Sequence, residues 1–419
     1  MTKQIIIIGG GASGMMAAIQ AARKGAKVII LEHMDRVGKK LLSTGNGRCN
    51  LTNLHQTEEC YRCQQEGFVF SVLNQFSVED TLQFFRDLGI YMKDRNGYIY
   101  PNSDQASSVL DVLRMELEHQ NIRVLLDCQV TSVQSSGRFF VKTSQGKITG
   151  DALILAAGSK AAKNTGSDGS GYDLARDFGH NLVPPLPALV QLRCKEHHYK
   201  QLAGIRTEAK VEVMFREQRL PGRKGEYLWK VLAEDRGELQ LTDYGLSGIP
   251  VFQISRYAAV ALHKGMPVKA RIDFLPQMTG NEANHMLYQR RQDMGYKTWE
   301  QWMIGLFNKK LGLVLLKLAG IEPGQNVSFS SQDQWERLLK QIKGYETEVV
   351  ATNSFEHAQV CCGGVDTMEV WPETMESKKV PGLYFAGEIL DVDGICGGYN
   401  LQWAWSSGAV AGINASLGN

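Results

Sequence analysis

Short hydrophobic runs and glycine-rich turns alternate near the start of the chain. Residues 5–8 are four isoleucines, and residues 27–31 (KVIIL) form a second run of the same kind. Runs this short and rich in β-branched residues are typical of strands buried on both faces of a parallel sheet. Residues 15–24 favour a helix that Gly25 ends. The pattern therefore predicts a strand–helix–strand unit.

Similar patterns recur further along the chain. Residues 151–158 (DALILAAG) and 383–386 predict more buried strands of this sheet. Residues 124–133 and 139–143 predict strands of an accessory β-layer. Residues 109–117 place leucine and valine at helical spacing, which predicts an amphipathic helix. The two ends of the chain thus contribute to one α/β domain.

The middle of the chain follows a different pattern. Residues 184–192 (PPLPALVQL) carry prolines that disfavour both a helix and a central strand, so we expect the chain to leave the first domain there. Residues 206–274 alternate between polar and apolar positions, which predicts antiparallel strands, and residues 281–343 turn helical. The predicted organisation is a first domain over 1–188 and 351–419, an inserted β-rich subdomain over 189–275 and an inserted helical subdomain over 276–350.

Composition narrows the class of function. The 419 residues include 46 Lys and Arg against 44 Asp and Glu, a net charge of +2 with no long block of one sign. Such a balance predicts no nucleic-acid partner and no membrane-surface partner. We find no signal peptide and no apolar run long enough to span a bilayer, and the eight cysteines are scattered, so we expect a cytoplasmic protein with free thiols. The oligomeric state stays open.

The glycines after the first predicted strand have the spacing of a dinucleotide-binding turn. Gly9, Gly11 and Gly14 form a G-x-G-x-x-G motif, and Glu32 ends the second strand. In such a unit the glycines allow a tight turn, a close approach of pyrophosphate and close helix packing, while the acid accepts hydrogen bonds from a ribose. Strand, helix, second strand and acid occur together, which makes the motif specific.

Two further segments favour FAD over NAD. Residues 38–53 (GKKLLSTGNGRCNLTN) form a basic loop rich in Gly and Asn, suited to phosphates or a flavin edge. Residues 382–400 end in a glycine-rich loop that opens a helix near Asn400. An extended FAD needs two such helix starts, and a helix N-terminus at the flavin pyrimidine edge stabilises the negative charge of the reduced ring.

These segments, together with Gly363–Gly364 and residues 369–378, resemble the aminoacetone-oxidase-like and BaiN-like family of FAD-binding oxidoreductases over nearly the whole chain. The resemblance implies a Rossmann-type FAD-binding domain, of the two-dinucleotide-fold flavoprotein class, with an inserted domain that has a β-barrel-like part and a helical part. Asn46 stands where glycine is frequent in relatives, and Asn tolerates a positive φ. The FAD contacts that the resemblance implies are Gly9, Gly11, Ala12, Ser13, Gly14, Glu32, Lys40, Arg48, Cys49, Asn50, Val130, Ala157, Gly158, Gly387, Glu388, Asn400, Leu401 and Gln402.

The predicted function is hydride transfer between FAD and a small organic substrate. The resemblance implies either reduction of an enone, with NAD(P)H as a transient donor, or oxidation of an amine by oxygen. Arg48, Tyr100 and Tyr399 are the candidate catalytic residues, because they lie in or beside segments expected near the flavin ring. Three alternatives stay open: a flavoprotein acting on tRNA, a dithiol oxidoreductase using Cys60 and Cys63, and a flavin-binding protein without catalysis.

Overall fold

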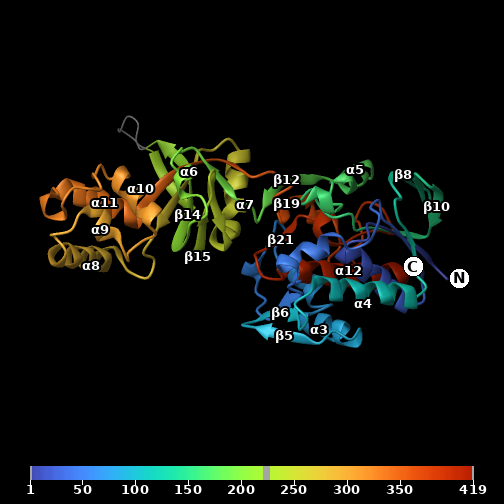
Figure 1. The fold of residues 1–419 in the computed structure, drawn as a ribbon. Coiled ribbons are helices and arrows are strands. Elements are labelled where there is room, and N and C mark those ends of the chain that lie inside the picture. The colour runs from blue at the N-terminus through green and yellow to red at the C-terminus, as the bar shows by residue number, and fades with distance from the viewer. Residues whose placement is uncertain (1, 220–226, 418–419) are drawn as a thin grey trace. The chain divides into compact units, whose positions relative to one another are not determined.

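A computed structural model describes residues 2–219 and 227–417 (Figure 1). The chain divides into two compact units, Met1–Leu186 with Gln359–Asn419, and Pro187–Ala358. Each unit has its own hydrophobic core. The inserted unit contains both the β-rich and the helical segments of the middle of the chain.

The first unit is built on a five-stranded sheet in which every neighbouring pair is parallel. Ile5 pairs with Ala152 on one side and with Val28 on the other. Strands from both ends of the sequence thus form one sheet, as predicted. In spatial order the strands are β20 (Leu383–Phe385), β11 (Ala152–Leu155), β1 (Gln4–Ile8), β2 (Lys27–Leu31) and β7 (Arg123–Leu125).

Two helices from opposite ends of the chain pack together in this unit. Figure 1 shows α12 (Tyr399–Leu417) in red among the blue N-terminal elements. A Cβ on Gly408 would lie 2.5 Å from Ser13 O, and one on Gly412 would lie 2.2 Å from Ala17 O. Glycine at these positions therefore lets α12 approach the backbone of α1 (Ala12–Arg23). The other helices of the unit are α2 (Phe68–Leu73), α3 (Val78–Asp87), α4 (Ala106–His119) and α5 (Ser170–Asp177).

Small sheets surround the central one. Residues 124–133, expected as accessory strands, are divided: the first part joins the central sheet as β7, and the rest begins β8 in a three-stranded sheet. The proline-rich segment is also extended, because a strand in a two-stranded sheet has a free edge where missing N–H groups are tolerated. These strands are β8 (Val130–Ser135), β9 (Phe139–Thr143), β10 (Gly146–Gly150), β12 (Leu182–Ala188) with β19 (Val360–Val365), β4 (Tyr61–Cys63) with β21 (Val392–Gly394), and β3 (Thr52–Asn53), β6 (Tyr98–Pro101) and β5 (Met92–Arg95).

The second unit contains a closed six-stranded barrel, which confirms the β-barrel-like part. In spatial order its strands are β13 (Leu192–Cys194), β16 (Gly245–Gly248), β15 (Tyr227–Leu241), β14 (Arg206–Arg219), β17 (Val268–Asp273) and β18 (Tyr345–Thr352). The expectation of strands throughout 206–274 is wrong over α7 (Ile249–His263), where Pro250 at the first turn and buried residues at helical spacing start a helix. The remaining helices are α6 (Tyr199–Leu202), α8 (Gly280–Asp293), α9 (Trp299–Met303), α10 (Lys309–Leu318) and α11 (Gln332–Gly344).

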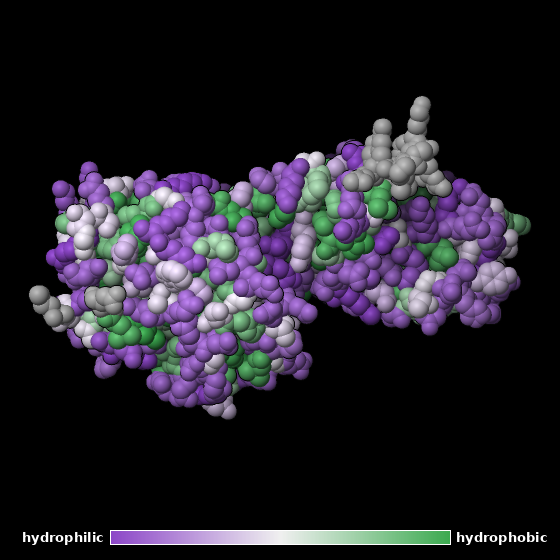
Figure 2. Space-filling model, turned by 180° about the vertical axis from the view of Figure 1, so that it is seen from behind, coloured by the Kyte–Doolittle hydropathy of each residue, from purple (hydrophilic) through white to green (hydrophobic). Residues whose placement is uncertain are grey.

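Hydrophilic residues cover most of the face shown in Figure 2, with hydrophobic residues in separate groups. None of the helices in the described part of the chain is both long and apolar enough to cross a membrane.

Candidate functional site

The turn between β1 and α1 has the steric features of a phosphate-binding loop. Gly9 has a φ of 105°, and a Cβ there would lie 2.4 Å from Ala156 O. A Cβ on Gly14 would lie 2.0 Å from Gly9 O, whereas one on Gly11 would meet nothing within 4 Å. Gly9 and Gly14 are thus required by close contacts within the protein, whereas Gly11 leaves open space for a ligand. Ala12 and Ser13 open α1, whose N-terminus has no side-chain cap and no acidic residue in its first turn.

Glu32 is held against this turn at the end of β2. Its Oε2 accepts a hydrogen bond from Gly10 N at 2.8 Å, and its Oε1 accepts one from Met34 N at 2.8 Å. The side chain is buried. A carboxylate oxygen can accept a second hydrogen bond, so both oxygens retain capacity for ribose hydroxyls.

Lys40 and Glu388 join the two ends of the sequence. Lys40 Nζ lies 2.6 Å from Glu388 Oε2, and Glu388 Oε1 accepts a hydrogen bond from Cys361 N at 3.0 Å. Nearby, Ser13 Oγ donates to Ala386 O at 3.3 Å, and a Cβ on Gly387 would lie 2.4 Å from Ser13 Oγ. The start of α1, the basic loop and the segment after β20 therefore meet at one place.

The basic loop folds into an irregular 3-10 segment with several left-handed residues. Gly45, Asn46 and Cys49 have φ values of 56°, 55° and 57°, so Asn46 does occupy a position with positive φ. Burial raises the pKa of Cys49 to about 12, which keeps it a neutral thiol. Asn50 Oδ1 is buried without a hydrogen-bond partner in the described structure, and a Cβ on Gly398 would lie 3.0 Å from it. An unsatisfied acceptor where two glycine-rich loops meet is suited to a donor of a bound ligand.

The first turn of α12 is fixed by side-chain hydrogen bonds. Asn400 accepts from Gly394 N at 2.9 Å and donates to Gly394 O at 2.8 Å, while Leu401 is partly buried. Gln402 is fully buried: its Oε1 accepts from Thr52 Oγ1 at 2.6 Å, and its Nε2 lies 2.9 Å from Thr81 Oγ1. The Gln402 amide thus bonds within the protein, and a direct contact with FAD stays a prediction.

The remaining predicted contacts lie around the same turn. A Cβ on Gly9 would lie 2.8 Å from Ala157 Cα, and Gly158 follows with a φ of 72°. Cys128 N donates to Glu32 O at 2.9 Å, two residues before Val130 begins β8. The structure therefore brings Ala157 against Gly9, with Gly158 next to it in the chain, and places Val130 two residues from the hydrogen bond to Glu32.

The candidate catalytic residues form two separate contacts that involve aromatic rings. Arg48 Cζ lies 5.8 Å from the centre of the Tyr100 ring, and burial raises the pKa of Tyr100. The Tyr399 and Tyr61 rings meet edge to face at 5.8 Å. Burial, then hydrogen bonding to Cys60, raises the pKa of Tyr399. Both phenols are protonated at neutral pH and can donate a hydrogen bond.

Sequence reasoning missed Tyr98, which lies on the same strand as Tyr100 and beside Gly397, next to the Tyr399 ring. A Cβ on Gly397 would lie 2.7 Å from the Tyr98 ring and 3.2 Å from the Tyr399 ring. Tyr98 and Tyr100 share one face of β6, because alternate residues of a strand point the same way. The Y-I-Y alternation was the signal that could have identified it.

Cys60 and Cys63 contact different groups. Cys60 Sγ lies 3.3 Å from Thr57 Oγ1, and Cys63 Sγ lies 3.3 Å from Thr367 Oγ1. Burial raises the pKa of Cys63, which disfavours a reactive thiolate. All eight cysteines are free, and among residues 2–219 and 227–417 no three His, Cys, Asp or Glu side chains are grouped as metal ligands.

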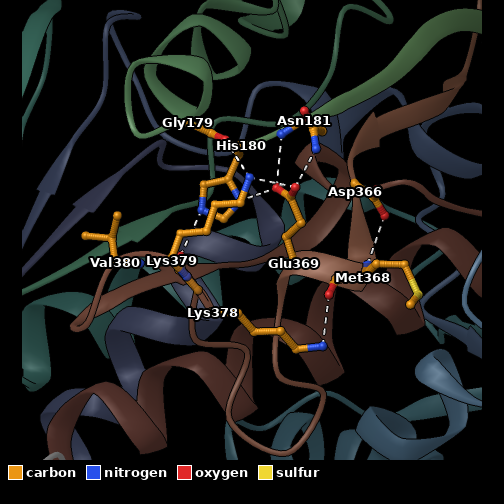
Figure 3. A network of polar contacts seen from close by, with 10 residues as sticks. Gly179, His180, Asn181, Asp366, Met368, Glu369, Lys378, Lys379 and Val380 are labelled. Atoms are coloured by element: carbon orange, nitrogen blue, oxygen red, sulfur yellow. Dashed lines mark hydrogen bonds and ion pairs between the residues drawn. The ribbon is translucent and has the colours of Figure 1, made fainter.

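A second polar network, shown in Figure 3, links residues 179–181, which precede β12, to residues 366–380. His180 Nδ1 lies 3.0 Å from Glu369 Oε2, and His180 Nε2 lies 2.8 Å from Ser377 Oγ. Lys379 N and Val380 N both donate to Ser377 Oγ, at 3.0 and 2.9 Å. With both lone pairs engaged, the hydroxyl must donate to Nε2, so His180 is neutral and donates from Nδ1 to Glu369.

The parallel sheet and the site around the glycine-rich turn after β1 define a Rossmann-type oxidoreductase that uses FAD. Three features fit that cofactor: the open space at Gly11, the ability of Glu32 to accept further hydrogen bonds, and the unpaired Asn50 Oδ1. A family model described as the HI0933-like protein Rossmann domain matches residues 3–414, and the chain belongs to this family.

Curated relatives match over nearly their whole length. A protein of Clostridium scindens named 3-dehydro-bile acid delta(4,6)-reductase is 48% identical over 416 residues, which is 99% of each chain. A ribosomal RNA dihydrouridine synthase of Haemophilus influenzae is 30% identical over 98% of each chain. Another, of Escherichia coli, is 31% identical over 96% of this chain and 95% of its own.

Proposed function

We propose that this protein reduces a carbon–carbon double bond conjugated to a carbonyl group in a steroid-like substrate, with NAD(P)H as the electron donor. The observation that carries the proposal is the 48% identity to the bile-acid reductase across 99% of both chains. That identity extends over the inserted unit as well as the cofactor domain.

The chain supplies the cofactor-binding groups from both of its ends. The open face of Gly11 and the N-terminus of α1 are suited to the pyrophosphate, and Glu32 to the ribose. Lys40 and Glu388 hold the basic loop beside the segment after β20, and Asn50 Oδ1 offers an acceptor. When bound, FAD carries the hydride between donor and substrate.

The tyrosines and Arg48 are proposed to act on the substrate carbonyl. Hydride addition to a conjugated double bond shifts negative charge to the carbonyl oxygen, which a neutral phenol or a guanidinium can stabilise. Tyr399 is buried and its pKa is raised, so its phenol remains a donor at neutral pH. Arg48, beside Tyr100, is the cationic candidate.

The nicotinamide donor is proposed to dock transiently. The sequence contains one complete G-x-G-x-x-G unit between a strand and a helix, and the flavin takes that unit. A stable second dinucleotide site would need another such unit.

A second candidate is reduction of uridine in ribosomal RNA. The two dihydrouridine synthases, at 30% and 31% identity over almost the whole chain, favour it. The uracil double bond is likewise conjugated to a carbonyl, so the same hydride and proton transfers would serve. The net charge of +2 disfavours a large RNA substrate.

One experiment separates the two candidates. The holoenzyme is reduced anaerobically with NADH or NADPH and then mixed either with a 3-oxo-Δ4 steroid or with unmodified ribosomal RNA. We expect the steroid to reoxidise the flavin and to gain two hydrogens by mass spectrometry. Reoxidation by RNA alone, with dihydrouridine in the digest, would replace the first candidate by the second.

A further inference from the structure

Helix α12 begins well beyond the start of α1. Gly408 packs on the backbone of Ser13, at the start of α1. Four residues further along both helices, Gly412 packs on Ala17, so the two helices run in the same direction. Tyr399 begins α12 nine residues before Gly408, which is about 14 Å along the helix axis. A cofactor whose pyrophosphate lies at the start of α1 must therefore be extended to reach the start of α12.

The first turn of α12 is tied to β3. Gln402 Oε1 accepts a hydrogen bond from Thr52 Oγ1 at 2.6 Å, and both residues are fully buried. A Cβ on Gly398, the residue before α12, would lie 2.7 Å from the carbonyl carbon of Thr52. Because β3 follows the basic loop directly, the bond between Gln402 and Thr52 fixes the helix start beside that loop.

The other end of the same amide is tied to α3 and to the next turn of α12. Gln402 Nε2 lies 2.9 Å from Thr81 Oγ1 and 2.9 Å from Ser406 Oγ. These two hydroxyls donate their own protons to Ser77 O and Phe76 O, so each accepts one hydrogen from the amide. Both amide hydrogens are thus used, and the orientation of the Gln402 side chain is fixed.

The start of α12 carries partial positive charge. The first N–H groups of an α-helix have no acceptor within the helix, and the helix dipole adds to their effect. No acidic residue lies in the first turn of α12 to neutralise it. The influence of a helix end falls off within about one turn, so it depends on where that end is held.

From these contacts we propose that Gln402 is a positioning residue that sets the reduction potential of the flavin. By fixing the first turn of α12 against β3 and α3, it keeps the helix N-terminus at the pyrimidine edge, where the reduced ring is negatively charged. This role needs no contact between the Gln402 side chain and the cofactor. The inference rests on the proposed binding of FAD between the two ends of the chain, and it does not depend on the identity of the substrate.

The test measures the two-electron reduction potential of the holoenzyme by anaerobic titration against a redox dye. Gln402→Met removes the hydrogen bonds while keeping the length of the side chain. We expect the helix start to loosen and the preference of the protein for reduced over oxidised FAD to fall about three- to tenfold. For two electrons this change equals a potential about 15–30 mV more negative.

A second variant isolates the contact with β3. Thr52→Val removes only the hydroxyl that Gln402 Oε1 accepts from and keeps the shape of the side chain. It should shift the potential in the same direction. The double variant should shift it no further than Gln402→Met alone, because both substitutions break the same contact. If Gln402→Met does not retain FAD, Thr52→Val decides the question alone.

Thr347→Val is the matched control. Thr347 is also buried, lies in the second unit and donates a hydrogen bond to Glu196. Its substitution therefore removes a buried hydroxyl of the same kind at a place unrelated to α12. It should lower the melting temperature and leave the reduction potential unchanged.

The outcomes are separable. An unchanged potential in both Gln402→Met and Thr52→Val, or an equal shift in Thr347→Val, would overturn the positioning role even if the wild type reduces its substrate. A wild type that binds no FAD would refute this role together with the proposed cofactor site. A holoenzyme whose potential depends on Gln402 but which reduces neither the steroid nor the RNA would keep the positioning role and lose the proposed function.

Discussion

Lys40 Nζ lies 2.6 Å from Glu388 Oε2, although 348 positions separate the two residues in the sequence. Both side chains are mostly shielded from solvent. The pair joins the basic loop to the segment after β20, and it marks where the two glycine-rich ends of the chain meet.

Breaking this pair should weaken FAD binding. Glu388→Gln leaves Lys40 without its carboxylate and loosens the loop, and we expect the dissociation constant of FAD to rise about tenfold, since an unpaired partly buried group costs about 1–3 kcal/mol. Titration of the apoprotein with FAD, followed by flavin fluorescence, gives the constant. The control is Glu79→Gln, which breaks the exposed pair with Arg86 and should change nothing. Equal effects of the two substitutions would contradict the role of the pair.

The glycines of the first turn should separate into two kinds. A Cβ at Gly11 meets open space and the residue has a φ of −78°, so Gly11→Ala should leave the melting temperature of the apoprotein unchanged but abolish FAD binding. A Cβ at Gly14 would lie 2.0 Å from Gly9 O, so Gly14→Ala should destabilise the apoprotein by about 1–3 kcal/mol. Thermal melts with and without FAD distinguish the two. A Gly11→Ala protein that binds FAD normally would place the phosphates elsewhere.

Tyr399→Phe should lower the rate of enone reduction about 100-fold without changing FAD affinity, because loss of a proton donor commonly costs 10²–10⁴-fold. Tyr100→Phe tests the second phenol in the same way. Burial also raises the pKa of Tyr384, to about 12, but its Oη faces Asn414 O at 3.5 Å, so Tyr384→Phe is the matched control. Unchanged turnover in both Tyr399→Phe and Tyr100→Phe would remove the tyrosines from the mechanism.

Acid should loosen the network around His180. Burial lowers the pKa of His180 below its usual 6.5. The negative charge of Glu369 opposes this shift, and the positive charge of Lys379 adds to it. The contribution of neutral His180 to the stability of the fold is therefore fully present above pH 6.5 and is lost as the pH falls through its lower pKa in the folded protein. The free energy of unfolding then changes by at most about 1.4 kcal/mol per pH unit for one proton. Urea unfolding between pH 7.5 and 5 should show a shallower slope in His180→Asn than in the wild type. Identical slopes would mean that His180 does not titrate in this range.

The double variant Cys60→Ser/Cys63→Ser should retain full activity, because serine keeps a hydrogen-bonding group beside Tyr399. The two thiols contact Thr57 and Thr367 separately, and burial raises the pKa of Cys63. Loss of turnover in a variant that still folds and still binds FAD would support the dithiol alternative.

The sequence predicted the central sheet well because its signals are local. Residues 5–8 are hydrophobic without interruption since β1 is buried between two parallel neighbours, and the glycine spacing reports contacts within one turn. The helix over 249–263 was missed because it lies inside a region of alternating strands. The strand over 182–188 was missed because prolines disfavour a central strand, and nothing local indicates that this segment pairs with only one other strand.

Long-range contacts set the limit for the site. The Y-I-Y alternation puts Tyr98 and Tyr100 on one face of a strand, but nothing near Tyr98 in the sequence indicates that it meets Gly397. The pairing of Lys40 with Glu388 likewise depends on the whole sheet being assembled, although both residues were predicted to contact FAD.

The packing of Gly408 and Gly412 against α1 has a consequence for biosynthesis. In the proposed FAD site, a ribosome that has made β1 and α1 has finished only half of the residues that hold the nucleotide, and the other half follows some 370 residues later, when Gly387 and then α12 emerge. With such a site, the flavin would load after translation of this helix, onto a chain whose inserted barrel has already had time to fold.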